Sequence, residues 1–548
     1  MIKNIQLNKT EKYIFLLVTV LNLIPVLQDK FFPTMDGAAH LYNSNIINEL
    51  IFENNNLFEL YFSFNEILVP NWIGHFLLSF FNFFFPAFIA EKILLLFYLI
   101  GLPYAFRKLI KTISSQNIGL SYFIFPFSYS FLFTLGFYNF SIAIILMLIT
   151  LNYWIKNYNQ QILNKKILIL ALLLTLTFFS HVFIFSLLMF FIGLHILFNL
   201  LYQSLSGSIN FKKSIKQTLI KSGKLLIASF IPLLLLFFYF STIHYANDHI
   251  FLEKQELIEW IKHIHPIISY NTTIEEAYTT KIFYILIVLV IISIYERINS
   301  IKKSFELRKE GENTLSKIKN ILIESDFWMI LTFIILFLYF VLPDSDYSSG
   351  FVSFRLCLLF FIFLIIWLSS QKFPKWLVWL SVIFLMFFHF KLNIYYSSVI
   401  KDLNKVVTNC ESATEHIEPN SIVLPINYYD HWLSTHFSNY LGIDNPIVIL
   451  ENYELDVGYF PLKWNENYIP NTLLGNIESG KFLCRQWKSN KQNSRKSINY
   501  VFVLGDFPYE LDSCNQAIKD VIQKNYDLIY KNESCNLFKI KYSKLTDD

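Results

Sequence analysis

Apolar stretches of about 17–22 residues recur along most of this chain, and each is long enough to cross a hydrocarbon core of about 30 Å as an α-helix. A helix satisfies its backbone polar groups internally, as the lipid interior requires. Only 16% of the 548 residues are charged and 54% are hydrophobic, whereas about 25% of the residues of a soluble domain are charged. This composition excludes a soluble globular enzyme, a disordered chain and a nucleic-acid binder. We therefore predict a polytopic α-helical protein of the cytoplasmic membrane.

Basic residues between the apolar stretches predict the orientation of the chain. Lysines precede the first stretch, which lies near residues 13–28, and this places the N-terminus in the cytoplasm. Four later basic clusters lie in alternate loops, so all four can face the cytoplasm at once. The first loop, 29–69, and the tail of the chain are then extracytoplasmic.

The apolar region 70–106 is long enough for two crossings, but two crossings would invert every later loop. We therefore predict one net crossing, with 71–85 as a partial, re-entrant or interfacial helix. A local exception to the charge rule is the alternative. The total is about eleven spans, within a range of about eleven to thirteen. The later spans are predicted near residues 118–135, 139–155, 167–180, 183–202, 222–243, 282–296, 326–342, 355–371 and 376–390.

The composition changes near residue 393, which predicts two modules, a transmembrane module at 1–392 and a terminal module at 393–548. The terminal module alternates short β-like runs with helical patterns. These features predict a small extracytoplasmic α/β domain. Its strands are predicted at 421–426, 446–450 and 498–504, and its helices at 401–416 and 511–523.

Four of the five cysteines lie in the terminal module, namely Cys410, Cys484, Cys514 and Cys535. An even set in an extracytoplasmic domain is compatible with two disulfides, for which three pairings exist. Four unpaired thiols are the alternative, and the sequence does not choose between the two.

The first extracytoplasmic loop begins with residues 33–42, directly after the first span. Asp36 fits the N-cap of a helix that begins near Gly37. On such a helix, Asp36 and His40 are four residues apart and share one face. A carboxylate and an imidazole at the membrane surface could bind a metal ion or abstract a proton. A helix cap beside an unrelated polar residue is the structural alternative.

Short fragments with a fixed order stand between residues 33 and 182. They are Asp36 with 39–42, Pro70 with Asn71, Pro86 with 90–92, the run 136–140, and Ser180 with His181. Together with the layout of spans and terminal domain, they resemble the C-type superfamily of membrane glycosyltransferases, and more narrowly a bacterial branch of it. Members of that superfamily use polyprenyl-phosphate-linked sugars and carry an acidic residue just after the first span. Here Asp36 is followed by Gly37, without an acidic pair of the Asp-x-Asp kind, which leaves metal dependence open.

The resemblance implies an inverting glycosyltransferase that acts at the outer face of the cytoplasmic membrane. The enzyme would move a sugar or glycan from a polyprenyl-phosphate- or pyrophosphate-linked lipid to a protein or glycan acceptor. Asp36 and His40 are the predicted catalytic pair, because a base must deprotonate or orient the acceptor. The leaving phosphate needs positive charge or hydrogen-bond donors, for which Arg355 and His181 are the predicted ligands. Snorkelling of Arg355 to lipid headgroups and a neutral, structural His181 are the alternatives.

Further polar residues are predicted to line the substrate cavity or to hold a divalent cation. Each also has a structural explanation, such as a helix cap, an interface anchor or a solvent-exposed side chain. The predicted cavity residues are Asn71, His75, Tyr138, Asn139, Glu66 and His431. The predicted ligands of a possible Mg²⁺ or Mn²⁺ ion are Asp36, Asp344 and Asp346.

The sequence contains no phosphate-binding glycine loop, zinc-ligand spacing, nucleophile elbow or dinucleotide fingerprint. Redox chemistry with a cofactor therefore has no support. Three other functions stay open: a glycan polymerase or ligase, a transporter of lipid-linked glycans, and a non-catalytic membrane scaffold. A transporter would favour matched halves with broken helices, and no such duplication is visible. A scaffold predicts that the polar residues of the first loop tolerate substitution.

Overall fold

The fold of this chain contains two compact units, each built from several chain segments. The computed structural model describes residues 2–158, 160, 164–206, 211–242, 249–306, 322–345, 350–465, 498–508 and 513–541. The first unit, here the helical unit, comprises Met1–Leu23, Tyr98–Phe133 and Phe140–Tyr396. The second, here the mixed unit, comprises Ile24–Phe97, Thr134–Asn139 and Ser397–Asp548. The two sequence modules divided at residue 393 stay a prediction.

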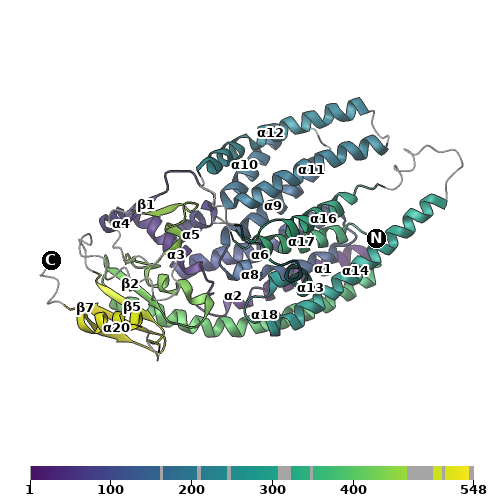
Figure 1. The fold of residues 1–548 in the computed structure, drawn as a ribbon. Helices are drawn as coiled ribbons and strands as arrows, with labels where there is room; N and C mark the ends of the chain where they lie inside the picture. Colours follow the sequence, from purple (N-terminus) through teal and green to yellow (C-terminus); the bar gives the residue numbers. More distant parts are fainter. Residues whose placement is uncertain are drawn as a thin grey trace. The chain divides into compact units, whose positions relative to one another are not determined.

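Long apolar helices dominate the chain and confirm the predicted class of polytopic α-helical membrane protein (Figure 1). Side chains such as Ile227 and Phe230 are 67% and 65% exposed, as lipid-facing residues would be. Seven helices of the described ranges have the length and hydropathy of membrane spans. They are α6 (Ala87–Ile113), α9 (Tyr138–Asn157), α11 (Val182–Ser206), α12 (Phe211–Thr242), α14 (Thr272–Glu306), α17 (Val352–Ser369) and α18 (Lys375–Ser412).

Shorter helices fill the rest of the helical unit, so the predicted number of about eleven crossings stays a prediction. Two of the predicted spans are interrupted. Pro25 and Pro126 each lie in the first turn of a new short helix, because proline fits that turn and cannot donate within a continuing one. The shorter helices are α1 (Ile2–Leu21), α2 (Ile24–Leu27, in the mixed unit), η2 (Ile118–Ile124), α7 (Phe125–Ser128), α8 (Phe131–Thr134), α10 (Asn164–Ser180), α13 (Lys254–His263), η3 (His265–Ile267) and α16 (Asp326–Val341).

Helix α5 (Trp72–Phe84) belongs to the mixed unit and corresponds to the predicted partial helix at 71–85. Its 13 residues span only about 20 Å at 1.5 Å per residue, less than a hydrocarbon core of about 30 Å. One face is buried and includes His75, whereas Phe76 and Phe80 on another face are at least half exposed. A short amphipathic helix of this kind agrees with a partial or interfacial position.

The terminal part of the chain forms a five-stranded sheet with the order β3-β2-β5-β7-β6. The first three strands are parallel and the last two are antiparallel to their neighbours. The central strands are buried on both faces, except at the half-buried Asn427, and this explains their nearly continuous apolar sequence. The elements are η4 (Ala413–His416), β2 (Ile422–Asn427), η5 (Trp432–Gly442), β3 (Val448–Ile449), η6 (Tyr453–Leu455), β5 (Tyr500–Leu504), α20 (Ser513–Asn525), β6 (Tyr526–Lys531) and β7 (Cys535–Ile540). The predicted α/β fold of this region is confirmed.

The first loop packs against this terminal region within the mixed unit. It contains α3 (Gly37–Asn48), a π-helical turn η1 (Glu49–Glu53), α4 (Asn56–Tyr61) and β1 (Phe62–Phe64). Helix α3 packs against both α5 and η5. Strand β1 pairs antiparallel with β4 (Leu462–Trp464), so residues about 400 positions apart share one small sheet.

The cysteines of the terminal region form no disulfide among the described residues. Cys410 at the end of α18 and Cys535 on β7 are buried free thiols. Cys484 and the side chain of Cys514 lie outside the described residues. The hypothesis of two disulfides is therefore not supported for the two cysteines that can be followed.

Candidate active site

Asp36 lies directly before α3, and that helix begins at Gly37 as predicted. Asp36 occupies the predicted N-cap position, but its side chain does not cap the helix. Its backbone is already in the right-handed helical region, and its side chain makes no capping hydrogen bond within the described first turn. The hydroxyl of Thr34 caps instead, accepting a hydrogen bond from the Gly37 N–H at 3.1 Å. The Asp36 carboxylate is therefore available for other interactions.

The segment before α9 fixes the backbone at Asp36. The Asp36 N–H donates to the carbonyl oxygen of Leu135 at 2.9 Å. Gly136 follows with a φ of +92°, and a Cβ at this position would lie 2.9 Å from the Gly37 nitrogen. Only glycine allows this backbone conformation and this close approach without strain.

The Asp36 carboxylate is buried, with 2% of the residue exposed. Burial raises the pKa of Asp36 to about 6, although the nearby His436 and His40 oppose this shift. The hydroxyl of Tyr453 donates a hydrogen bond to the carboxylate. The Oδ1 atom is buried without a hydrogen-bond partner among the described residues. A buried carboxylate oxygen without a hydrogen bond is costly.

His436 on η5 is the basic group beside Asp36. Its Nε2 atom lies 3.8 Å from Asp36 Oδ1, and its Nδ1 atom pairs with Glu451 Oε1 at 2.6 Å. Burial alone lowers the pKa of His436, but the charge and hydrogen bond of Glu451, together with the charges of Asp36 and Glu454, outweigh this effect, so the net pKa is raised. The imidazole is thereby held between two carboxylates, and its ring stacks on Tyr453 at 4.7 Å between centroids.

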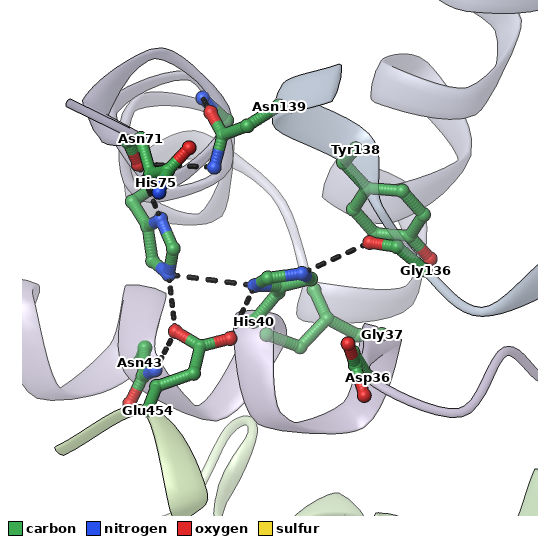
Figure 2. Close-up of polar contacts among 12 residues, drawn as sticks. Asp36, Gly37, His40, Asn43, Asn71, His75, Gly136, Tyr138, Asn139 and Glu454 are labelled. Atoms are coloured by element: carbon green, nitrogen blue, oxygen red, sulfur yellow. Dashed lines mark hydrogen bonds and ion pairs between the residues drawn. The ribbon is translucent and has the colours of Figure 1, made fainter. Parts of the chain in front are cut away.

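His40, His75 and Glu454 form a second, fully buried cluster, hereafter the histidine–glutamate cluster (Figure 2). His40 Nδ1 lies 2.6 Å from Glu454 Oε1, and His75 Nε2 lies 2.7 Å from Glu454 Oε2. The same two ring nitrogens are 3.4 Å apart. The side-chain N–H of Asn43 also donates to Glu454, at 2.6 Å.

Electrostatic attraction offsets the burial of this cluster. Burial alone raises the pKa of Glu454, but the adjacent His40 and His75 outweigh it, so the net pKa is lowered. Burial alone lowers the pKa of His40, but the charge and hydrogen bond of Glu454, together with the charge of Asp36 and the Gly136 carbonyl, outweigh this effect, so the net pKa is raised. Opposite charges held together in this way compensate each other for their desolvation.

The predicted cavity residues Asn71, Tyr138 and Asn139 surround these groups in the mixed unit (Figure 2). The side chain of Asn139 links α5 to the start of α9: its N–H donates to the Asn71 carbonyl at 3.0 Å, and its oxygen accepts from the Gly74 N–H at 2.6 Å. The Tyr138 hydroxyl donates to Glu91 Oε1 at 2.7 Å and contacts Thr34.

Arg355 and His181, the predicted phosphate ligands, lie in the helical unit on α17 and just before α11. The Arg355 guanidinium carbon lies 5.7 Å from the Phe140 ring centroid, and the His181 ring centroid lies 5.3 Å from it. The structure therefore brings the two side chains against one aromatic ring.

Several other predicted site residues have ordinary structural roles. Asp344 accepts a hydrogen bond from the Ser353 N–H at 2.9 Å, which caps α17. Glu66 is exposed and pairs with Lys463 at 2.8 Å. The ring of His431 caps η5 by accepting from the Leu433 N–H. None of these contacts joins the clusters around Asp36 or Glu454, and Asp346 lies outside the described residues.

Four residues of the site escaped prediction as site residues, namely His436, Glu451, Tyr453 and Glu454. They lie on or beside two 3-10 segments of the terminal region. Neither segment has the spacing of a known motif, and His75 and Glu454 are separated by 379 positions. No signal in the sequence joins them to the first loop.

The histidine–glutamate cluster is the group of side chains in the described ranges that could hold a metal ion. Its two nitrogens and one carboxylate differ from the oxygen ligands that Mg²⁺ prefers. The predicted ligand set of Asp36, Asp344 and Asp346 stays a prediction, because Asp346 lies outside the described residues. The sequence showed no zinc-ligand spacing because the three ligands come from distant elements.

No protein-family profile and no curated protein matches this chain. Solved structures do match. An oligosaccharyltransferase from Archaeoglobus fulgidus, in complex with Zn and sulfate, is 11% identical over 89% of this chain and 67% of its own, with a TM-score of 0.39. ArnT from Cupriavidus metallidurans, in the apo state, is 8% identical over 97% of this chain and 99% of its own, with a TM-score of 0.43.

The same oligosaccharyltransferase, tethered with an acceptor peptide that contains the NVT sequon, matches with 11% identity over 90% of this chain and 69% of its own, and a TM-score of 0.36. Because these identities and TM-scores are low, the substrates of this chain have to be inferred from its own site.

Proposed function

We propose that this protein is an inverting membrane glycosyltransferase. It moves a sugar or glycan from a polyprenyl-phosphate-type lipid to a protein or glycan acceptor at the outer face of the cytoplasmic membrane. The observation that carries the proposal is the buried Asp36 carboxylate, whose Oδ1 atom lacks a hydrogen-bond partner among the described residues. A carboxylate that is desolvated and has a free lone pair is suited to accept a proton.

In the proposed reaction, an acceptor hydroxyl or amide gives its proton to Asp36 as its oxygen or nitrogen attacks the anomeric carbon. The bond from that carbon to the phosphate oxygen breaks, and the electron pair leaves with the polyprenyl phosphate. Attack opposite the leaving group inverts the configuration of the anomeric carbon. A base placed for this step contributes a rate factor of about 10²–10⁴.

The neighbouring residues have positioning roles in this proposal. His40 follows Asp36 by one helical turn and is fixed by the Gly136 carbonyl at 2.9 Å. His436 holds positive charge beside Asp36 and favours its ionised form. We retain Arg355 and His181 as the proposed ligands of the donor phosphate, because a guanidinium can donate two hydrogen bonds to a phosphate.

The test replaces Asp36 with asparagine, which keeps the shape of the side chain and removes its basicity. Purified protein is given radiolabelled polyprenyl-phosphate- and pyrophosphate-linked sugars with membrane extracts as acceptors, and release of the polyprenyl phosphate is measured. We expect Asp36→Asn to lower the rate by about 10²–10⁴-fold. Asp402→Asn is the matched control, since Asp402 is exposed on α18 with its side chain 74% accessible.

Full activity of Asp36→Asn would remove Asp36 from the role of base. Movement of the labelled lipid across the membrane without a new glycosidic bond would favour a transporter instead. Tolerance of substitutions at both Asp36 and His40 would favour a scaffold.

A further inference from the structure

The histidine–glutamate cluster joins three separate elements of the mixed unit. His40 is on α3, His75 is on α5 and Glu454 is on η6. All three side chains are at least nine-tenths buried. Their donor atoms all lie within 4.8 Å of one another. The proposed transfer reaction assigns no chemistry to this convergence.

In each histidine ring, the outer nitrogen points away from Glu454 and the inner nitrogen faces it. The hydrogen bond of the outer nitrogen determines whether the inner nitrogen carries a proton. His40 Nε2 lies 2.9 Å from the carbonyl oxygen of Gly136, and His75 Nδ1 lies 3.1 Å from that of Asn71. A carbonyl oxygen only accepts, so each outer nitrogen carries the proton. In the neutral rings, the inner nitrogens therefore direct lone pairs at the Glu454 carboxylate.

With neutral rings, three electron-pair donors face one another in a buried site, so either protons or a metal ion must lie between them. The two inner nitrogens are 3.4 Å apart, close to the separation of about 3.3 Å that two ligands at 2.0–2.1 Å from a tetrahedral ion have. Histidine ligands characteristically donate their other N–H to a backbone carbonyl, which fixes the ring. Both histidines here have this arrangement.

We infer that His40, His75 and Glu454 form a binding site for a divalent transition-metal ion of the zinc type. Two imidazole nitrogens and one carboxylate suit Zn²⁺ and disfavour Mg²⁺ and Ca²⁺, which prefer oxygen ligands. Three protein ligands leave one tetrahedral position for a water molecule or a substrate oxygen. The ion would also fix α3, and with it Asp36, against α5 and the terminal region.

The competing occupant is a pair of protons, one on each inner nitrogen, which would carry the same total charge as one divalent ion. The full-length protein in detergent is stripped with a chelator and titrated with Zn²⁺ against a metal indicator. We expect about one Zn²⁺ per chain, with Mg²⁺ unable to displace it. Co²⁺ in place of Zn²⁺ is expected to give the visible bands of a four-coordinate site. If the stripped protein takes up no Zn²⁺, the inference is overturned.

Substitutions test whether these three residues bind the ion. His40→Gln, His75→Gln and Glu454→Gln are each expected to weaken Zn²⁺ binding by more than about 100-fold, beyond the 10–100-fold typical of outer-sphere changes. His389→Gln is the matched control, because His389 is equally buried on α18 and lies outside the cluster. Unchanged binding in all three ligand variants would contradict the assignment.

Two further measurements keep the inference testable if a variant fails to fold. X-ray absorption at the Zn edge of the wild-type protein should show two imidazole ligands, and any other number of imidazoles would contradict the site. Asp36→Asn should keep the ion while losing transfer, which separates this inference from the proposed function. Loss of the ion in Asp36→Asn would show that the three-ligand assignment is incomplete.

Discussion

The carbonyl of Gly136 reaches His40 because position 136 has no Cβ. Its φ of +92° and the 2.9 Å approach to the Gly37 nitrogen both exclude a larger residue. We expect Gly136→Ala to lower the free energy of unfolding by about 1–3 kcal/mol and to reduce transfer, because the start of α3 would be displaced. Unfolding in detergent, followed by circular dichroism, measures the first effect.

Gly193 supplies the control for this substitution. It lies within α11, and no described atom lies within 4 Å of a Cβ built there. Gly193→Ala should therefore leave stability unchanged or raise it by up to about 1 kcal/mol, since alanine favours a helix. Equal stability of the two alanine variants would refute the strain at Gly136.

Local spacing accounts for the site residues that could be predicted. Asp36 and His40 are one helical turn apart, so a short sequence window relates them. Glu454 has no such relation to His40, because the contact depends on how the terminal region packs on α3. Asp36 also shows the limit of a local rule, since a helix start predicts a cap and Thr34 performs that role.

The side chain of Tyr42 links helix α3 to strand β3. The Tyr42 hydroxyl donates to the Ile447 carbonyl at 2.8 Å and accepts from the Ile449 N–H at 3.0 Å, with the side chain fully buried. We expect Tyr42→Phe to cost about 1–3 kcal/mol of unfolding free energy, because two buried backbone groups lose their partner.

The same change at Tyr13, which is 70% exposed on α1, should alter stability by no more than about 0.5 kcal/mol. Denaturant titrations of both variants provide the comparison. If Tyr42→Phe is as stable as Tyr13→Phe, the joint between α3 and β3 contributes nothing to stability.

Apolar periodicity predicted most of the secondary structure, because long helices and buried strands depend on hydrophobic burial. Strands β2, β3 and β5 overlap the predicted runs and α20 overlaps the predicted helix, whereas β6 and β7 were not predicted. The interruptions within the spans at 13–28 and 118–135 were missed. They depend on proline in the first turn of a new helix, which a hydropathy average does not detect.

The distribution of basic residues predicts the orientation of the whole chain in the membrane. Reporter fusions can check it: alkaline phosphatase is active only outside the cytoplasm, whereas green fluorescent protein fluoresces inside it. We expect fluorescence from a fusion after Lys302, in a basic loop, and phosphatase activity from fusions after Glu253 and at the C-terminus. The opposite pattern would invert the predicted topology.

The partnership between His75 and Glu454 has a consequence for biosynthesis. The ribosome makes Glu454 379 residues after His75, which takes about 20–80 s at 5–20 residues per second. During that interval His40 and His75 still lack the carboxylate that they share in the folded protein. A nascent or prematurely terminated chain can therefore insert its early helices, yet it cannot assemble this centre before nearly the entire polypeptide has been translated.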